Sequence, residues 1–406
     1  MNNIKLMFAD KIKIFSRTLF YIFVFLLPWQ TRLILTPEKP ELLSFSIYLS
    51  EIVLWLTILF WLGSGGLKKI KAYFVFVLFC FFALLSLFWA PDKMAAFRVW
   101  LYVLEGGLVY FYLKNENTAR LGTAYVFLSS LFLVSIFGIW QFFNLGSPAW
   151  KWLGLAERGA WNLGDIIIET AGGRWLRAYG SFPHPNIFGG YLATGILLVA
   201  IILSDLPTGG EPNNSQKRKM ALYFTGAIFV FSLFLTFSRS AWLALFIALI
   251  YFVIKNIKSR EFRKFFVFLL VLAIALSIIF WPFLKTRATS SGRLEQKSNT
   301  ERVASWRDGL LAWRANPFFG TGAGNYTVGR SATYGEPPHN VFILSLAELG
   351  IFGFVAYLFL WRRLWKNKAA RALILLFFII GIFDHYLWSL YSGQILLWLG
   401  LSLTRD

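Results

Sequence analysis

Three short polar motifs interrupt a mostly apolar sequence, and their residue types suit anion binding and proton transfer. The first occupies residues 177–186, the second residues 236–242 and the third residues 337–342. The first two carry arginine, whose planar fork matches phosphate oxygens. The third carries histidine, the natural general base near neutral pH. What each motif can do depends on the elements that present it.

The first motif joins an arginine to the start of a helix. Pro185 and Asn186 predict a helix N-terminus, with unpaired N–H groups and a positive dipole end, close to Arg177 in the sequence. Together these groups suit an anion such as a phosphate. The alternative is that Arg177 snorkels to lipid headgroups and that Asn186 only caps the helix.

The second motif places Arg239 where two apolar runs meet with almost no loop between them. A charged side chain at the edge of a bilayer is costly, and such a residue is a functional candidate. Its guanidinium group again suits phosphate oxygens. The alternative is an interfacial anchor, but the near absence of a loop favours a functional role.

The third motif places His339 and Asn340 where a long loop meets an apolar run that contains Glu348. This position suits a general base at the membrane boundary. The Asp384-His385 pair, further along the chain, fits a second base or an orienting dyad. It fits equally a turn between the last two helices, and this is the interpretation we favour.

The composition predicts an all-α, polytopic membrane protein. Hydrophobic residues make up 57% of the 406 residues and charged residues only 15%, and the mean hydropathy is +0.60. A water-soluble domain cannot hide that much apolar surface. The net charge of +20 does not indicate nucleic-acid binding, because Lys and Arg lie in short clusters between apolar runs.

Several cofactor classes find no sequence support. The single cysteine, Cys80, cannot form an intramolecular disulfide. No His, Asp or Glu cluster has metal-ligand spacing, and no nucleotide-binding glycine motif is present. We therefore expect no metal and no cofactor, and any transferase here would need an activated, membrane-borne donor.

The apolar runs predict about twelve transmembrane helices, since a span needs about 20 apolar residues. They cover residues 15–36, 43–62, 72–89, 96–113, 121–143, 186–204, 219–236, 239–254, 264–284, 340–361, 370–386 and 388–403. Every second short connection is basic, which places the N- and C-termini in the cytoplasm.

Two long loops, residues 144–185 and 285–339, then lie outside within a single membrane domain of residues 1–406. Long loops translocate whatever their charge, so their basic residues need another explanation. These residues are Arg158, Arg174, Arg177, Arg287, Arg293, Arg302, Arg307, Arg314 and Arg330. The second loop also contains an expected amphipathic helix, from the spacing of Val303, Trp306, Leu310 and Trp313, which ends at Asn316-Pro317.

The order of these motifs resembles the O-antigen ligase family and its relatives, the Wzy-type polymerases and protein O-oligosaccharyltransferases. The resemblance covers residues 174–360, and the first five spans match only in hydropathy. It rests on Arg177 with Gly180-Ser181-Phe182 and Pro185-Asn186, Ser238-Arg239-Ser240, Arg302 with Trp306, Asn316-Pro317-Phe318-Phe319-Gly320-Thr321-Gly322, and His339-Asn340 leading into Glu348-Leu349-Gly350.

The resemblance implies a metal-independent glycosyltransferase of the GT-C type in the bacterial inner membrane. Such enzymes move a glycan from undecaprenyl diphosphate to an acceptor, here lipid A–core, at the periplasmic face. By this resemblance His339 is the catalytic base, and the diphosphate is bound by Arg177, Arg239 and Arg302. Possible supporting residues are Asn186, Asn340, His184 and Glu348, although the family pattern often has Asn or Gly in place of His184.

Several alternatives share these residues. A polymerase that joins lipid-linked repeat units, or a protein O-oligosaccharyltransferase, would use the same donor and differ only in the acceptor. A flippase for lipid-linked glycans would need the arginines but no general base. We predict direct, inverting transfer, and a covalent glycosyl-enzyme formed by a carboxylate is the alternative mechanism.

Overall fold

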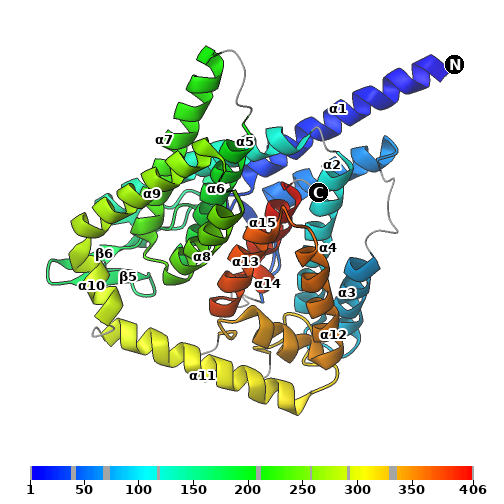
Figure 1. Ribbon diagram of the computed structural model, residues 1–406. Helices are drawn as coiled ribbons and strands as arrows, with labels where there is room; N and C mark the ends of the chain where they lie inside the picture. Colours follow the sequence, from blue (N-terminus) through cyan, green and yellow to red (C-terminus); the bar gives the residue numbers. More distant parts are fainter. Residues whose placement is uncertain are drawn as a thin grey trace. The chain divides into compact units, whose positions relative to one another are not determined.

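The computed structural model describes residues 2–37, 43–66, 74–116, 119–206, 212–256, 258–289, 293–328 and 336–404. The chain is mostly helical, with three small two-stranded sheets among these residues (Figure 1). It divides into two compact units. The first unit holds Met1–Leu27, Thr31–Val126 and Ser298–Asp406, and the second holds Pro28–Gln30 and Phe127–Lys297.

The first unit is built from paired helices. Helix α1 packs on α2, α3 on α12, and α4 on α15. Small residues allow these close approaches, since Gly106 of α4 meets Trp398 and Gly107 meets Phe76. The elements are α1 (Asn2–Leu26), β1 (Arg32–Ile34), β2 (Ser46–Tyr48), α2 (Leu49–Gly63), α3 (Phe74–Leu85), α4 (Lys93–Asn115), α12 (Val341–Trp365), α13 (Arg371–Phe383), α14 (Tyr386–Ser389) and α15 (Tyr391–Ser402).

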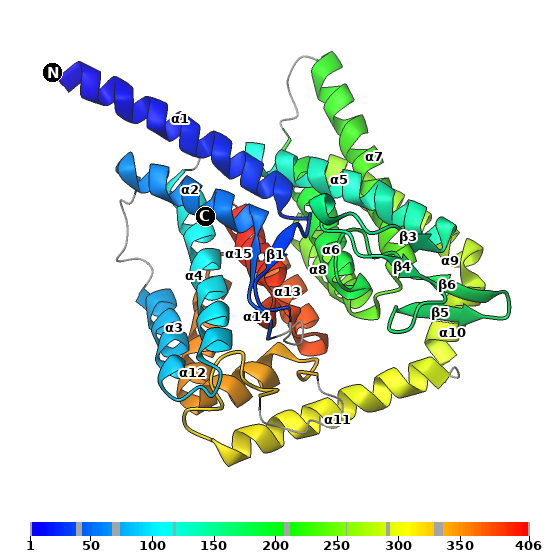
Figure 2. The same ribbon diagram turned by 180° about the vertical axis from the view of Figure 1, so that it is seen from behind.

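The second unit is organised around α6 (Pro185–Ser204), which is buried along almost its whole length and contacts α7, α8 and α9. Strand β5 packs against α10, and Figure 2 shows the β5–β6 hairpin beside this helix. The other elements are β3 (Gly146–Ser147), β4 (Arg158–Gly159), β5 (Ile167–Thr170), β6 (Gly173–Leu176), α7 (Pro212–Thr236), α8 (Arg239–Asn256), α9 (Arg260–Ile279) and α10 (Trp281–Thr289). Helices α5 (Arg120–Asn144) and α11 (Arg293–Ala315) each continue from one unit into the other.

Seven helices in the described residues are long and apolar enough to cross a membrane: α4, α5, α6, α7, α8, α9 and α12. Three shorter apolar helices cover Leu49–Gly63, Phe74–Phe88 and Arg371–Phe383. Large apolar side chains on α9 are exposed, among them Val271, Ile278 and Ile279. Water would not tolerate this surface, whereas lipid does. The protein is therefore a multi-pass membrane protein.

Two predicted spans near the N-terminus are wrong at one end. Within the predicted span 15–36, helix α1 ends at Leu26, and residues 32–34 form strand β1. The physical reason is Pro28, which cannot continue a helix and restricts the residue before it. The run 43–62 likewise begins as strand β2, which pairs antiparallel with β1 before α2 starts at Leu49.

The predicted span 340–361 is interrupted at Gly350, whose φ of 62° and ψ of −171° are not helical. The loop that follows α11 packs against this break. Thr321 N donates to Ala347 O (3.0 Å), and Ile351 N donates to Pro317 O (2.9 Å). The break is therefore stabilised because loop atoms bond the backbone groups on both sides of it.

The two predicted outer loops contain more secondary structure than the sequence predicted. Residues 144–185 hold strands β3 to β6, which an all-α prediction did not include. The predicted span 264–284 ends at Ile279, and α10 begins after Phe280. The predicted amphipathic helix lies within α11, whose last residue, Ala315, precedes Asn316-Pro317 as expected.

We predict that Gly350→Ala destabilises the protein by about 2 kcal/mol or more, since a positive φ disfavours any side chain and the new Cβ would overlap the Phe318 carbonyl. Thermal unfolding in detergent should show a lower midpoint. Gly381→Ala is the matched control, because its Cβ would meet its nearest atom at an ordinary 3.6 Å. Equal midpoints for the two variants would contradict this account of the break.

Candidate functional site

The loop that carries Arg177 folds around a small core of its own. Ala160, Ile167, Leu176 and Tyr179 form this buried cluster. Nearby, the Asp165 carboxylate accepts from the Arg158 guanidinium (2.7 Å) and from Gly159 N (2.8 Å). These contacts give the loop a fixed path up to the first motif.

Residues 179–180 of the loop are held against α5. Gln141 accepts from Tyr179 N (3.2 Å) and donates to Gly180 O (2.9 Å). Gly180 has a φ of 60°, and a Cβ there would overlap Val134. This turn sends the chain into α6 and fixes where Arg177 lies relative to the helix start.

Arg177 lies at the N-terminus of α6 and is only 3% exposed. Its Nε donates to Thr236 O (2.6 Å), and its Nη2 donates to Oδ1 of Asn186 (3.0 Å). Such burial disagrees with the alternative in which Arg177 snorkels to lipid headgroups. Asn186 is not the helix cap either, because its backbone N–H donates to Nδ1 of His184, the N-cap residue (3.0 Å).

This geometry explains a departure from the family pattern. The Nδ1 atom of His184 accepts the hydrogen bond that an Asn side chain would accept at an N-cap. The sequence alone did not indicate this role, because histidine is not a usual cap residue. The structure thus brings Arg177, His184 and Asn186 together at one helix start.

Arg239 is the first residue of α8 and follows a strained turn. Phe237 in that turn has a φ of 47°, which is unusual for a residue with a side chain. Such strain persists only where the surroundings impose it, and it concentrates at functional sites. Arg239 NH1 donates to Arg287 O at 3.4 Å, and the side chain is partly buried.

His339 lies in the first unit, directly before α12, and Asn340 fixes its position. The Asn340 side chain caps α12 by accepting from Phe342 N and Ile343 N, each at 2.9 Å. Its amide group donates to Ile382 O (3.0 Å), which ties the start of α12 to the end of α13. Asn340 therefore brings His339 to the turn that follows α13.

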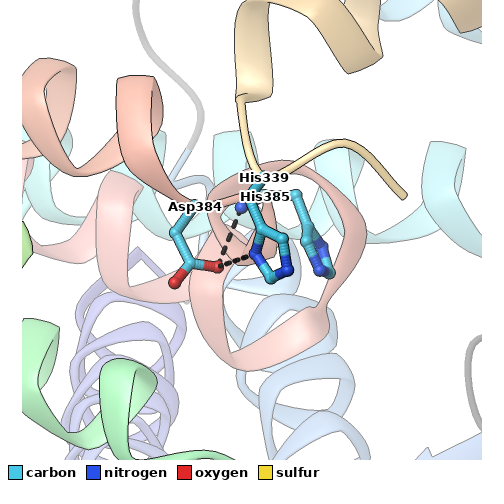
Figure 3. Close-up of side chains that lie close together, drawn as sticks. All are labelled: His339, Asp384 and His385. Atoms are coloured by element: carbon cyan, nitrogen blue, oxygen red, sulfur yellow. Dashed lines mark hydrogen bonds and ion pairs between the residues drawn. The ribbon is translucent and has the colours of Figure 1, made fainter. Parts of the chain in front are cut away.

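That turn supplies Asp384 and His385, so the three side chains form one cluster (Figure 3). His339 Nδ1 lies 3.9 Å from Asp384 Oδ1, and the same oxygen accepts from His385 N (2.9 Å). The two imidazole rings are 5.3 Å apart between centroids. Within the part of the chain that the structure describes, Nδ1 of His339 makes no hydrogen bond, so its polar neighbour is the carboxylate.

The cluster distinguishes its two histidines. Burial and, to a smaller extent, the neighbouring His339 lower the pKa of His385 from 6.5 to about 4, although Asp384 acts in the opposite direction. The Nδ1 atom of His385 is also engaged with the Ser389 hydroxyl (2.7 Å). His385 is therefore neutral near pH 7, and its proximity to Asp384 does not make it a second charged partner.

Sequence reasoning favoured a turn at Asp384-His385, and the pair does lie in a turn. What it missed is that this turn meets His339, 45 residues earlier, because no local pattern encodes the contact. The sequence did offer one indication of this contact. A histidine stands at the end of a loop, and a carboxylate stands between two later helices.

A metal ion is another use of this cluster. Donor atoms of His339, Asp384 and His385 all lie within 4.8 Å of one another. Two imidazoles and a carboxylate are a familiar ligand set for zinc. The sequence spacing did not indicate such a set, because its members come from distant segments.

Glu348 has a structural role in the same unit. It is 3% exposed, and it accepts hydrogen bonds from Gly324 N (2.8 Å), Tyr326 N (3.3 Å) and Trp388 Nε1 (2.7 Å). These bonds hold the glycine-rich turn and α14 against α12. Glu348 thus supports the elements that carry His339 and Asp384.

Arg302 lies on α11 in the same unit as His339, one helical turn before Trp306. Trp306 Nε1 donates to His339 O (3.2 Å), which fixes α11 against the loop that carries the histidine. Arg302 is half-buried. The candidate residues therefore fall into two groups, Arg177, Arg239, Asn186 and His184 in the second unit and His339, Asn340, Arg302 and Glu348 in the first.

We predict that His385 makes folding stability depend on pH. Its folded pKa is depressed, so the unfolded chain binds the extra proton between about pH 6.5 and 4, and acidification across that window favours unfolding. The loss should be at most about 3 kcal/mol. Thermal midpoints measured from pH 7 to pH 4 should fall less in His385→Gln, and identical pH profiles would exclude this role.

Two comparisons with known proteins test the resemblance to a family. No curated protein matches the chain. Residues 224–358 match the sequence model of the Wzy_C domain, described as O-antigen ligase. This segment contains Arg239, Arg302, His339 and Glu348. Over this segment the chain is similar to the O-antigen ligase family.

Proposed function

We propose that this protein transfers a glycan from undecaprenyl diphosphate to an acceptor hydroxyl, with lipid A–core as the acceptor. The observation that supports the proposal most is the His339–Asp384 arrangement inside a chain with an O-antigen ligase domain. A transporter would use arginines but would need no imidazole backed by a carboxylate. A polymerase would use the same chemistry with a different acceptor.

His339 takes the proton from the acceptor hydroxyl as that oxygen attacks the anomeric carbon. The Asp384 carboxylate faces Nδ1, so the proposal assigns the transferred proton to Nε2, which lies 3.8 Å from the exposed Glu336 carboxylate. The bond between the anomeric carbon and the diphosphate oxygen breaks, and its electron pair leaves with the diphosphate. Direct displacement inverts the anomeric centre.

Arg177, Arg239 and Arg302 bind the diphosphate in this proposal. Guanidinium groups donate two parallel hydrogen bonds to phosphate oxygens and carry permanent charge. Because the leaving group gains negative charge as the glycosidic bond breaks, fixed cations stabilise the transition state more than the ground state. The N-terminus of α6 beside Arg177 adds backbone donors.

The proposed setting is the bacterial inner membrane, with about twelve spans, a GT-C type architecture and both termini in the cytoplasm. The loops that carry Arg177 and His339 then face the periplasm. There the lipid-linked donor is available without a nucleotide sugar. Metal and cofactor are not required in this mechanism.

We predict that purified protein moves glycan from its undecaprenyl diphosphate donor to lipid A–core and releases undecaprenyl diphosphate. His339→Ala should lower the rate about 10²- to 10⁴-fold through loss of the base. Asp384→Asn should have a smaller effect and should change the pH profile. Product mass spectrometry with lipid A–core, free glycan and peptide acceptors identifies the acceptor.

His184→Asn is the matched control for these variants, since an Asn side chain can take over the helix cap and should leave activity near that of wild type. Each variant should be checked for an unchanged thermal midpoint. Activity in His339→Ala equal to that of wild type would exclude the general-base role. Release of no undecaprenyl diphosphate by wild type with any acceptor would favour the transporter.

We predict that chelation leaves transfer unchanged. The mechanism uses His339 as a base with Asp384 facing its Nδ1, and a metal ion held by these side chains would engage the carboxylate and the imidazole that proton transfer needs. Transfer should therefore be equal before and after dialysis against EDTA, and added Zn²⁺ should not increase it. Loss of activity on chelation, with recovery on adding Zn²⁺, would assign the His339, Asp384 and His385 cluster to a metal instead.

A further inference from the structure

The His339, Asp384 and His385 cluster contains the donor atoms of a divalent metal site, although the proposed mechanism uses no metal (Figure 3). Nδ1 of His339 lies 3.9 Å from Oδ1 of Asp384, and one donor atom from each side chain lies within 4.8 Å of the other two. Zinc ligands sit about 2 Å from the metal, so side-chain movements of about 1 Å would bring these three donors to coordinating distance. Three protein ligands leave a fourth position open.

Two features of the His339 ring itself point to a ligand. Its Nδ1 is buried and makes no hydrogen bond among the residues that the structure describes. A buried polar atom without a partner is costly, and an ion between this nitrogen and Asp384 would remove that cost. At the opposite edge of the ring, Nε2 lies 3.8 Å from the Glu336 carboxylate. Histidines that bind metals typically donate their second ring N–H to such a group.

The other two ligands are held in place before any ion binds. Nδ1 of His385 shares a hydrogen bond with the Ser389 hydroxyl (2.7 Å), which orients the ring. Oδ1 of Asp384 accepts from the His385 backbone N–H (2.9 Å). Ligands that are already ordered lose little entropy on binding. The His339 side chain is 22% exposed, so an ion can reach the cluster from solvent.

We propose that this cluster is an inhibitory site for a divalent transition-metal ion such as Zn²⁺. The inference rests on the proposed function, in which Nε2 of His339 accepts the proton and Nδ1 carries the hydrogen of the neutral ring. An ion that binds Nδ1 displaces this hydrogen, and the ring then carries its hydrogen on Nε2, toward Glu336. Nε2 has no lone pair left for the proton of the acceptor hydroxyl, so the glycosidic bond stays intact. The ion-free cluster is the active form, and transfer remains metal-independent.

The test measures metal binding and glycan transfer separately, on full-length protein dialysed against EDTA. Co²⁺ is the binding probe, because its visible absorption reports coordination by protein ligands. We expect a Co²⁺ band that Zn²⁺ abolishes, and loss of transfer over the same range of Zn²⁺ concentration. His385→Gln removes a ligand that takes no part in the proposed proton transfer. It should keep the transfer rate within about threefold of wild type, while Zn²⁺ binding and inhibition both weaken about 10-fold or more.

Two further variants serve as controls. Glu336→Gln keeps all three ligands and removes only the carboxylate behind the His339 ring, so it should weaken Co²⁺ binding less than His385→Gln does. His184→Asn removes a histidine outside the cluster and should leave the Co²⁺ band and the Zn²⁺ concentration for half-inhibition unchanged. A loss of the Co²⁺ band in His184→Asn would place the ion at another histidine and would contradict the inference.

The remaining outcomes separate this inference from the function on which it rests. If Zn²⁺ inhibits His385→Gln as strongly as wild type, the ion acts elsewhere, for example on the diphosphate of the donor, and the inference is wrong. If wild type transfers glycan but shows no Co²⁺ band and no response to Zn²⁺, the inference fails and the proposed function stands. If Co²⁺ binds in a manner that depends on His385 but no glycan moves to any acceptor, the metal site stands and the proposed function fails.

Discussion

A helix that is interrupted in an apolar environment must find new partners for the backbone groups that it releases, and this constraint organises the first unit. At Gly350 the partners come from residues 317–322, which bond Ala347 and Ile351 on the two sides of the break. Glu348 extends the arrangement with its buried carboxylate, which three donors hold in place. The loop between α11 and α12 is therefore attached at both of its ends, and His339 sits at one of them.

In the second unit, arginine side chains supply the partners for backbone groups that a turn releases. The turn between α7 and α8 exposes the carbonyls of Thr236 and Phe237, and two guanidinium groups from other segments bond them. Each arginine thereby donates a hydrogen bond to a backbone carbonyl that has left the helix, and this bond holds the side chain in one conformation. A side chain ordered in this way would lose little entropy on binding an anion, so the structural role is compatible with the proposed anion-binding role.

The sequence predicted those features that depend on local pattern. Runs of apolar residues predicted most helices, and Asn316-Pro317 predicted the end of α11. The chemical roles assigned to Arg177, Arg239 and His339 rest on their residue types and stay proposals. Contacts between distant segments were not predictable in this way. The β1–β2 pairing, the break at Gly350, the meeting of Asp384 with His339 and the position of Arg287 all depend on tertiary packing, which no window of sequence contains.

The cluster before α12 also bears on which imidazole would act as the base in the proposed mechanism. Two histidines with rings 5.3 Å apart cannot both hold a proton at low cost, because their charges would repel. Burial, together with the neighbouring His339, lowers the pKa of His385 to about 4, so this ring is neutral near pH 7. Oδ1 of Asp384 lies 3.9 Å from Nδ1 of His339 and accepts a hydrogen bond from the His385 backbone N–H. Of the two histidines, His339 is therefore the one that the proposed mechanism uses as its base, because His385 is a poor proton acceptor near neutral pH.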